Sequence, residues 1–327
     1  MDPEEDSDLP WVEKYRPQHL DQLVAHSHII STIQKFISER KLPHLLFYGP
    51  PGTGKTSTIL AVARQMHGSH FNTMSLELNA SDDRGITVVR EQIKQFASTQ
   101  QLVGGGIKLV ILDEADAMTG PAQFALRRII EKYTKTTRFC LVCNYVSKII
   151  PALQSRCTRF RFTPLAFEEA SRRILEISVK EQITVSDDGL AAITTLAGGD
   201  MRKCLNILQG CALTSKRITA ETVHLCTGTP SPELIDALLE KLLTLNFNDN
   251  FREIQEIRLA AGLSLTDIIR ELHRSILKIE FPDKMKAGLV RRLAEVEVRL
   301  SVGSNEKLQQ AAMIGAFLEA RQIGGSA

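Results

Sequence analysis

The sequence FYGPPGTGKT at residues 47–56 carries the strongest structural signal in this 327-residue chain. Its last eight residues, 49–56, fit the phosphate-binding pattern G-x-x-x-x-G-K-[ST] in full. A short apolar run at 45–48 precedes them, and a run of helix-forming residues at 59–63 follows. A buried strand, a glycine-rich loop and a helix therefore occur in the order that this motif requires. The pattern predicts a site for a nucleoside triphosphate.

Each position of the loop has a physical reason. Gly49, Gly52 and Gly54 allow backbone conformations that a Cβ would block, so that backbone N–H groups can turn toward an anion. The N-terminus of the following helix adds donors to the same site. Lys55 supplies positive charge for the β- and γ-phosphates, and the Thr56 hydroxyl is placed to ligate Mg²⁺. The other loop residues expected at the nucleotide are Pro50, Pro51, Thr53 and Ser57.

A second motif, KLVILDEAD at residues 108–116, places acidic residues directly after an apolar run. The run indicates a buried central strand, and ligands of open α/β sheets bind beyond the carboxyl ends of the strands. We therefore expect Asp113 to hold Mg²⁺ and Glu114 to polarise the attacking water. Asn144 follows another predicted strand, 138–143, at the same edge. It senses the γ-phosphate, orients water, or is an ordinary residue of a turn that ends the strand.

Two further segments are open to two interpretations. LPWVEKYRP at residues 9–17 forms either an arm packed on the core or a wall for the nucleotide base, made by Val12, Tyr15 and Arg16. Gly198 and Gly199 interrupt a helical pattern that restarts at residue 200, which places Arg202 in the first turn of a helix. Arg202 either reaches a bound γ-phosphate or is a surface cation.

The alternation of strands and helices up to residue 162 predicts a mostly parallel sheet with helices on both faces, an α/β fold. Helical patterns follow, with a linker rich in Gly and Pro at residues 227–232. We expect three domains: an α/β P-loop ATPase domain at 1–163, a helical lid at 164–229 and an all-helical domain at 230–327. The last domain shows no catalytic constellation and is expected to serve packing or oligomerisation.

Composition limits the possible partners. The 40 Lys and Arg residues nearly balance the 38 Asp and Glu residues, so a nucleic-acid role must rest on local patches or on an assembly. No run of 18 apolar residues occurs and the first residues are acidic, so neither a membrane span nor a signal peptide is expected. Cys140 and Cys143 lie three apart in a predicted strand, where side chains at that spacing point to opposite faces. Joint metal ligation by this pair is therefore not expected.

Taken together, these motifs resemble the AAA+ ATPases, and specifically the small subunits of replication factor C, the eukaryotic sliding-clamp loader. The resemblance covers nearly the whole chain and implies an AAA+ P-loop ATPase domain, a helical lid and an all-helical C-terminal collar. It rests on LPWVEKYRP (9–17), GPPGTGKT (49–56), NASDDRG (79–85), LVILDEAD (109–116), CN (143–144), SRC (155–157) and GDMR (199–202).

The resemblance implies a role for each matching residue of the nucleotide site. Lys55 and Thr56 would bind the ATP phosphates and Mg²⁺. Asp113 would hold the metal, and Glu114 would be the catalytic base. Asn144 and Arg202 would be the residues called sensor 1 and sensor 2 in this family.

Other matching residues are implied to act outside the chain's own nucleotide site. Arg156 of the SRC motif would be an arginine finger that reaches the ATP site of a neighbouring subunit. An added positive charge at the γ-phosphate accelerates phosphoryl transfer, and its supply by a neighbour couples hydrolysis to assembly. Arg84 and Arg90 would follow the DNA backbone in a central channel, and contacts to phosphates position a duplex without reading its sequence.

The expected function is therefore a small subunit of the clamp loader, a DNA-stimulated ATPase that opens the PCNA sliding clamp and loads it onto primer–template DNA in replication and repair. Its expected partners are the other replication factor C subunits of a hetero-pentamer in the nucleus. The alternative is an ATP-binding scaffold of the same ring that supplies Arg156 but hydrolyses little ATP itself. A DEAD-box helicase is disfavoured because the chain has one nucleotide domain, and a protein-remodelling ATPase because no aromatic-hydrophobic pore loop is present.

Overall fold

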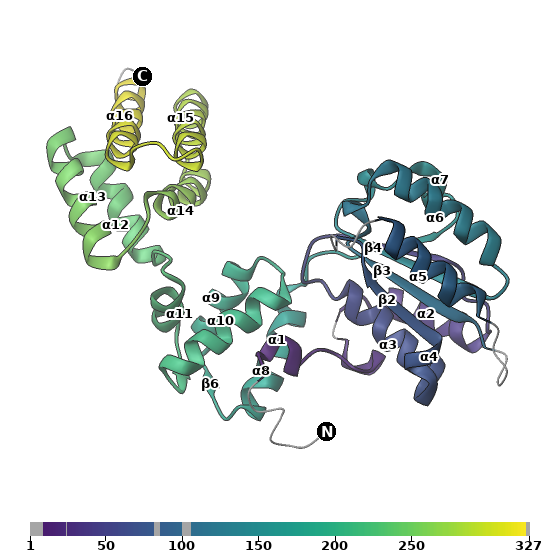
Figure 1. Ribbon diagram of the computed structural model, residues 1–327. Helices are drawn as coiled ribbons and strands as arrows, with labels where there is room; N and C mark the ends of the chain where they lie inside the picture. Colours follow the sequence, from purple (N-terminus) through teal and green to yellow (C-terminus); the bar gives the residue numbers. More distant parts are fainter. Residues whose placement is uncertain (1–8, 24, 82–85, 100–105, 325–327) are drawn as a thin grey trace. The chain divides into compact units, whose positions relative to one another are not determined.

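The structure, a computed structural model, describes residues 9–23, 25–81, 86–99 and 106–324 of the chain (Figure 1). It divides into two compact units, Met1–Thr219 and Ala220–Ala327. The predicted boundary at residue 163 falls inside the first unit, and the predicted boundary at 229 falls after the first helix of the second. Arg84 lies outside the described residues, and Arg90 lies on a helix whose first five side chains are also outside them.

The first unit contains a sheet of five strands in the order β2-β3-β4-β1-β5, and every paired neighbour runs parallel. The strand of the phosphate loop, β1, lies between β4 and β5, with Leu45 opposite both Cys140 and Thr158. All loops that follow the strands therefore meet at one edge of the sheet. The strands are β1 Leu45–Tyr48, β2 Ser75–Asn79, β3 Lys108–Asp113, β4 Thr137–Cys143 and β5 Thr158–Arg161.

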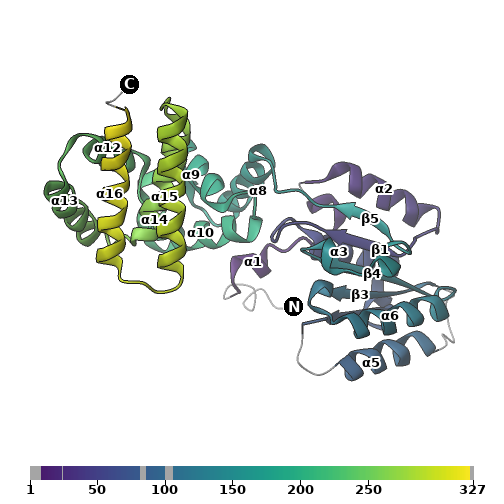
Figure 2. The same ribbon diagram turned by 90° about the horizontal axis from the view of Figure 1, so that it is seen from above.

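Helices cover both faces of this sheet, as predicted (Figure 2). Side chains alternate along β1, so that Phe47 packs with helices α2 and α3 while Leu46 packs on the opposite face with α5 and α6. Cys140 and Cys143 of β4 likewise belong to the two opposite faces, which confirms the prediction from their spacing. The helices are α2 Ser27–Ser38, α3 Lys55–His67, α5 Ile86–Ser98 and α6 Gly120–Tyr133.

Three helices after the sheet, together called the lid region below, complete the first unit: α8 Phe167–Lys180, α9 Asp187–Ala197 and α10 Met201–Thr214. A polar side chain caps two of them, because Ser186 accepts from the amide of Gly189 and Asp200 from that of Arg202. Two short parallel strands join this group. The remaining elements are β6 Thr184–Val185, β7 Arg217–Ile218, α1 Trp11–Lys14, η1 Leu20–Gln22, η2 Gly68–His70, α4 Phe71–Met74, η3 Ala115–Ala117, η4 Val146–Lys148 and α7 Pro151–Gln154.

The N-terminal arm, residues 9–17, is bound to the lid region by hydrogen bonds and an ion pair. The amide of Trp11 donates a 3.1 Å hydrogen bond to Oε1 of Gln209 on α10. Lys14 Nζ lies 2.6 Å from a carboxylate oxygen of Glu181, directly after α8. Arg173 of α8 donates a 2.9 Å hydrogen bond to the carbonyl oxygen of Tyr15. The arm therefore packs on the lid region, while part of it also faces the nucleotide site described below.

The second unit is all-helical (Figure 1). Three of its helices begin at polar caps, because Ser231, Asn246 and Ser264 each accept a hydrogen bond from an amide three residues later. One continuous apolar core joins its last five helices. None of the described helices has the length and apolar character needed to cross a membrane. The helices are α11 Ala220–Thr227, α12 Pro232–Thr244, α13 Phe247–Ala261, α14 Leu265–Lys278, α15 Asp283–Ser301 and α16 Glu306–Gly324.

Candidate nucleotide-binding site

The phosphate loop joins the carboxyl end of β1 to the first residue of α3. Gly49 has φ of +147°, and a Cβ there would lie 2.0 Å from the carbonyl oxygen of Phe162. Gly52 has φ of +67°, and a Cβ there would lie 1.6 Å from Oδ1 of Asp200. Both positions thus require glycine twice over, for the backbone conformation and for the close approach of another segment.

Lys55 is buried at the mouth of this loop, with 7% of its surface exposed. Its ammonium donates to the carbonyl oxygens of Gly49 at 2.8 Å and Pro50 at 2.7 Å, and to Oδ1 of Asn144 at 3.0 Å. Burial lowers the pKa of Lys55, whereas the nearby Asp113 carboxylate acts to raise it. The loop therefore holds a cation whose hydrogen bonds an incoming phosphate can take over.

Thr56 and Asp113 place two oxygen atoms side by side next to Lys55. The Thr56 hydroxyl donates a 2.7 Å hydrogen bond to Oδ2 of Asp113, and Oδ1 of Asp113 accepts from the amide of Glu114 at 2.8 Å. No group of three or more His, Cys, Asp and Glu side chains suited to a metal occurs among the described residues. Mg²⁺ commonly takes one or two protein oxygens and completes its shell with phosphate and water. The pair of Thr56 and Asp113 fits that mode of binding.

Glu114 and Asn144 directly follow two neighbouring strands of the sheet, β3 and β4. Glu114 is exposed and directly follows β3. Its backbone adopts a left-handed conformation with φ of +52°, which is uncommon for a residue other than glycine. The turn at Asn144 is fixed by Asp116, whose Oδ2 accepts from the amides of Asn144 at 3.3 Å and Tyr145 at 3.1 Å. Asp116 is a supporting residue that reasoning from the sequence missed, because its contact depends on how the loops of β3 and β4 meet.

The lid region contacts the phosphate loop directly. The amide of Met201 donates a 3.1 Å hydrogen bond to the carbonyl oxygen of Gly52, beside the cap formed by Asp200. Arg202 is exposed in the first turn of α10 and lines the same cleft as Lys55. Its positive charge also contributes to lowering the pKa of Lys55, after burial, which is the largest cause.

One cleft of the first unit brings most of the predicted nucleotide-site residues together. Gly49 and Pro50 do not line it, but they supply the carbonyl oxygens that bind Lys55. Arg16 lines the cleft and also pairs with Glu13 at 3.3 Å. The predicted residues that line the cleft are Val12, Tyr15, Arg16, Pro51, Gly52, Thr53, Gly54, Lys55, Thr56, Ser57, Asp113, Glu114, Asn144 and Arg202.

The cleft also has a wall that was not predicted from the sequence. His26 lines it with only 8% of its surface exposed, and its ring packs edge-to-face on Phe162 at 4.9 Å between centroids. Burial lowers the pKa of His26, and its Nε2 has no hydrogen-bond partner among the described residues. No local pattern marks these positions, because segments far apart in the sequence contribute them. The apolar part of the wall consists of Leu23, Ala25, Leu165, Met201 and Leu205.

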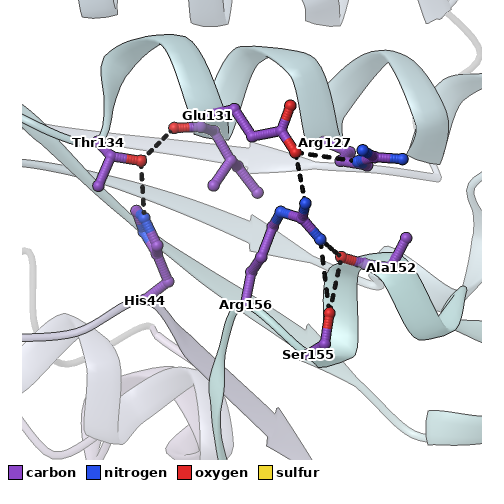
Figure 3. Close-up of polar contacts among 8 residues, drawn as sticks. His44, Arg127, Glu131, Thr134, Ala152, Ser155 and Arg156 are labelled. Atoms are coloured by element: carbon purple, nitrogen blue, oxygen red, sulfur yellow. Dashed lines mark hydrogen bonds and ion pairs between the residues drawn. The ribbon is translucent and has the colours of Figure 1, made fainter.

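Arg156 is the predicted catalytic residue that lies away from this cleft. It follows α7, and its guanidinium forms an ion pair with Glu131 of α6 at 2.5 Å (Figure 3). Its side chain is 32% exposed, so it remains reachable from outside the subunit.

Two family models match the chain. Residues 45–165 match the family described as "ATPase family associated with various cellular activities (AAA)", and residues 230–316 match the replication factor C C-terminal domain. The chain is 54% identical to replication factor C subunit 5 of Homo sapiens, over 96% of this chain and 93% of the human protein. The chain belongs to the replication factor C family. It is one of the small subunits of this clamp loader.

Other relatives place the subunit within this family. Replication factor C subunit 5 of Arabidopsis thaliana is 54% identical over 98% of this chain and 90% of the plant protein. Subunit 3 of Saccharomyces cerevisiae is 48% identical over 94% of this chain and 93% of the yeast protein. The stretches at 9–17, 127–145 and 299–307 (RLSVGSNEK) led to the expectation of a subunit 5, and the relatives carry the names subunit 5 and subunit 3.

The fold of the chain is similar to that of a solved structure. The branch migration motor RuvB of Thermotoga maritima superposes with a TM-score of 0.53 and 15% identity, over 82% of this chain and 99% of that one. At this identity the likeness concerns the AAA+ fold alone.

Proposed function

We propose that this subunit binds ATP with Mg²⁺ and hydrolyses it within a hetero-pentameric replication factor C ring, which opens PCNA and loads it onto primer–template DNA in the nucleus during replication and repair. The observation that carries the proposal is the meeting of Lys55, Asp113 and Arg202 in one cleft. Each comes from a different part of the chain. Lys55 and Arg202 supply positive charge, and Asp113 supplies, with Thr56, two oxygens suited to a metal.

The described side chains suggest how the reaction proceeds. Lys55 exchanges its bonds to loop carbonyls for phosphate oxygens, and Arg202 adds charge from the lid. Glu114, exposed at the end of β3, is placed to orient the attacking water, and Asn144, which lines the same cleft, supplies a polar contact for the γ-phosphate. A Mg²⁺ ion bound at Thr56 and Asp113 would supply neutralising charge for the β- and γ-phosphate oxygens. The protein thus contributes position and electrostatics to a transfer that needs little covalent chemistry.

Arg156 would act at the nucleotide site of a neighbouring subunit. Its distance from the subunit's own cleft and its exposure support a role as arginine finger at a neighbouring nucleotide site. DNA contact by Arg84 and Arg90 rests on their match to the family and is proposed on that ground alone.

The experiment is reconstitution of the complex with the other subunits, comparing wild type with Arg156→Ala and Glu114→Gln in ATPase assays stimulated by DNA and PCNA. We expect Arg156→Ala to lower turnover by about 10³-fold at the neighbouring site while the complex still assembles. We expect Glu114→Gln to remove turnover at the subunit's own site. If Glu114→Gln leaves turnover intact while Arg156→Ala abolishes it, the subunit is an ATP-binding scaffold that supplies the finger. Unchanged turnover in Arg156→Ala would contradict the finger.

A further inference from the structure

The guanidinium of Arg156 is already held in place within the subunit. Its Nη1 donates a 2.6 Å hydrogen bond to the carbonyl oxygen of Ala152, one turn earlier. Its Nη2 donates a 2.5 Å hydrogen bond to Oε1 of Glu131, which lies 25 residues earlier in the sequence, on α6 (Figure 3). The two contacts use different nitrogens of the guanidinium, so together they restrain both its position and its plane.

Glu131 is shared between two arginines. The oxygen that binds Arg156 also accepts from Nε of Arg127, one turn earlier on α6, at 3.0 Å. Hydrogen bonds from Arg127 first and from Arg156 second lower the pKa of the Glu131 carboxyl, so it is ionised at neutral pH. Two cations against one anion leave a net positive charge at this surface, which favours approach of a polyanion.

The helix that carries Glu131 is firmly anchored. Ile129 and Ile130 of α6 are buried against the sheet. At the end of the helix, the Thr134 hydroxyl donates to the carbonyl of Ile130 and lies 3.3 Å from Nε2 of His44 (Figure 3). Glu131 therefore projects from a rigid support, whereas Arg156 follows a helix of only four residues, α7.

We propose that Glu131 is a positioning residue that holds Arg156 in the orientation needed at a neighbouring subunit's nucleotide. This inference rests on the proposed function. An arginine has five N–H donors. The bonds to Ala152, to Glu131 and, at 3.5 Å, to the Ser155 hydroxyl leave two of them for phosphate oxygens. Arg156 can therefore bind a phosphate without leaving Glu131. Fixing its rotamer beforehand removes ordering entropy from the transition state, which raises turnover more than it changes ATP affinity.

The test uses the reconstituted complex with four variants of this subunit: Glu131→Ala, Glu131→Gln, Arg156→Ala and the double variant of both alanine changes. We expect Glu131→Ala to lower kcat of the DNA- and PCNA-stimulated ATPase about tenfold, with KM for ATP unchanged within about twofold. Glu131→Gln retains an acceptor for Arg156 and should lose less. In the Arg156→Ala background, Glu131→Ala should have no further effect, because Glu131 acts through Arg156.

Glu39→Ala is the matched control. Glu39 is also an exposed helix-associated glutamate paired with a cation one turn away, Lys35 at 4.0 Å, and its loss should leave kcat unchanged. An unchanged or raised kcat in Glu131→Ala, together with a large loss in Arg156→Ala, would overturn the inference and leave the proposed function standing. A further loss in the double variant would also overturn it, since it would show a general structural role. No effect of Arg156→Ala would overturn the finger itself.

Discussion

Thr56 and Asp113 lie 57 residues apart in the sequence, and the hydroxyl of the first donates a 2.7 Å hydrogen bond to the carboxylate of the second. The bond joins the start of α3 to the end of β3. It places a hydroxyl and a carboxylate oxygen near the buried ammonium of Lys55. Such preorganisation means that the site needs little rearrangement to receive a phosphate and its metal.

Asp113→Asn tests the role of this carboxylate. An amide oxygen still accepts from Thr56, but it lacks the negative charge that favours a divalent cation. Mg²⁺ raises the affinity for ATP by some factor in wild type, and we expect this factor to be about tenfold smaller in Asp113→Asn. We expect turnover to fall by about 10²-fold. A titration with a fluorescent ATP analogue, with and without Mg²⁺, measures the first effect. Asp236→Asn, an exposed change in the second unit, should retain the full Mg²⁺ dependence, and retention of it in Asp113→Asn would contradict the assignment.

Lys55→Met removes the buried cation of the phosphate loop. A ligand at 100 times its Kd stabilises the folded state of wild type by about 2.7 kcal/mol. We expect ATP to raise the Tm of wild type and to leave that of Lys55→Met unchanged, because the main charge facing the phosphates is gone. Thermal unfolding followed by fluorescence measures the shift. The exposed Lys41, replaced by Met, should keep the ATP-dependent rise, so a rise in both variants would contradict a role for Lys55.

Gly49→Ala tests the close packing of the loop on Phe162, the residue directly after β5. The new Cβ would lie 2.0 Å from a backbone oxygen of Phe162, in a conformation with positive φ. We expect the free energy of unfolding of the first unit to fall by about 3 kcal/mol, measured by urea denaturation. Gly210→Ala is the opposite control, since Gly210 lies on α10 and a Cβ added there would meet no described atom within 4 Å. That change should raise stability by about 0.5–1 kcal/mol, and equal losses in both variants would contradict the packing argument.

The buried His44 makes the free energy of unfolding of the first unit depend on pH. Burial lowers the pKa of His44 to about 4, and its Nδ1 accepts a hydrogen bond from the amide of Phe139 at 3.2 Å, which requires a neutral ring. Between the unfolded pKa near 6.5 and the folded pKa near 4, the unfolded chain binds more protons. The free energy of unfolding should therefore fall as the pH drops through this window, by about 2 kcal/mol at pH 5 relative to pH 7.5.

The measurement is urea denaturation at pH 7.5 and pH 5 for wild type and His44→Gln. The variant should be less stable at pH 7.5 but should lose less on acidification, because its side chain does not titrate in this range. His28→Gln removes an exposed histidine and should retain the wild-type difference between the two pH values. An equal acid loss in wild type and His44→Gln would show that other groups cause it.

Much of this arrangement could be predicted from the sequence because its causes are local. The loop at 49–56 requires glycines and a lysine at fixed positions, and the strand of Asp113 and Glu114 needs only an apolar run followed by acids. The opposite faces of Cys140 and Cys143 follow from the period of a strand. The short helix α11 and the strands β6 and β7 were not predicted, since their short segments carry too little periodic signal.

The sequence by itself thus determined the phosphate loop, the acidic strand end and the class of fold. Only the tertiary structure decided which distant segments complete the site. The strand order β2-β3-β4-β1-β5 places Asn144 beside Lys55, and the lid region brings Asp200 against Gly52. The pairing of Glu131 with Arg156 likewise depends on the packing of α6 against α7. Local preferences act over a few neighbouring residues, whereas these contacts depend on chain crossovers and on burial of apolar faces across the whole unit.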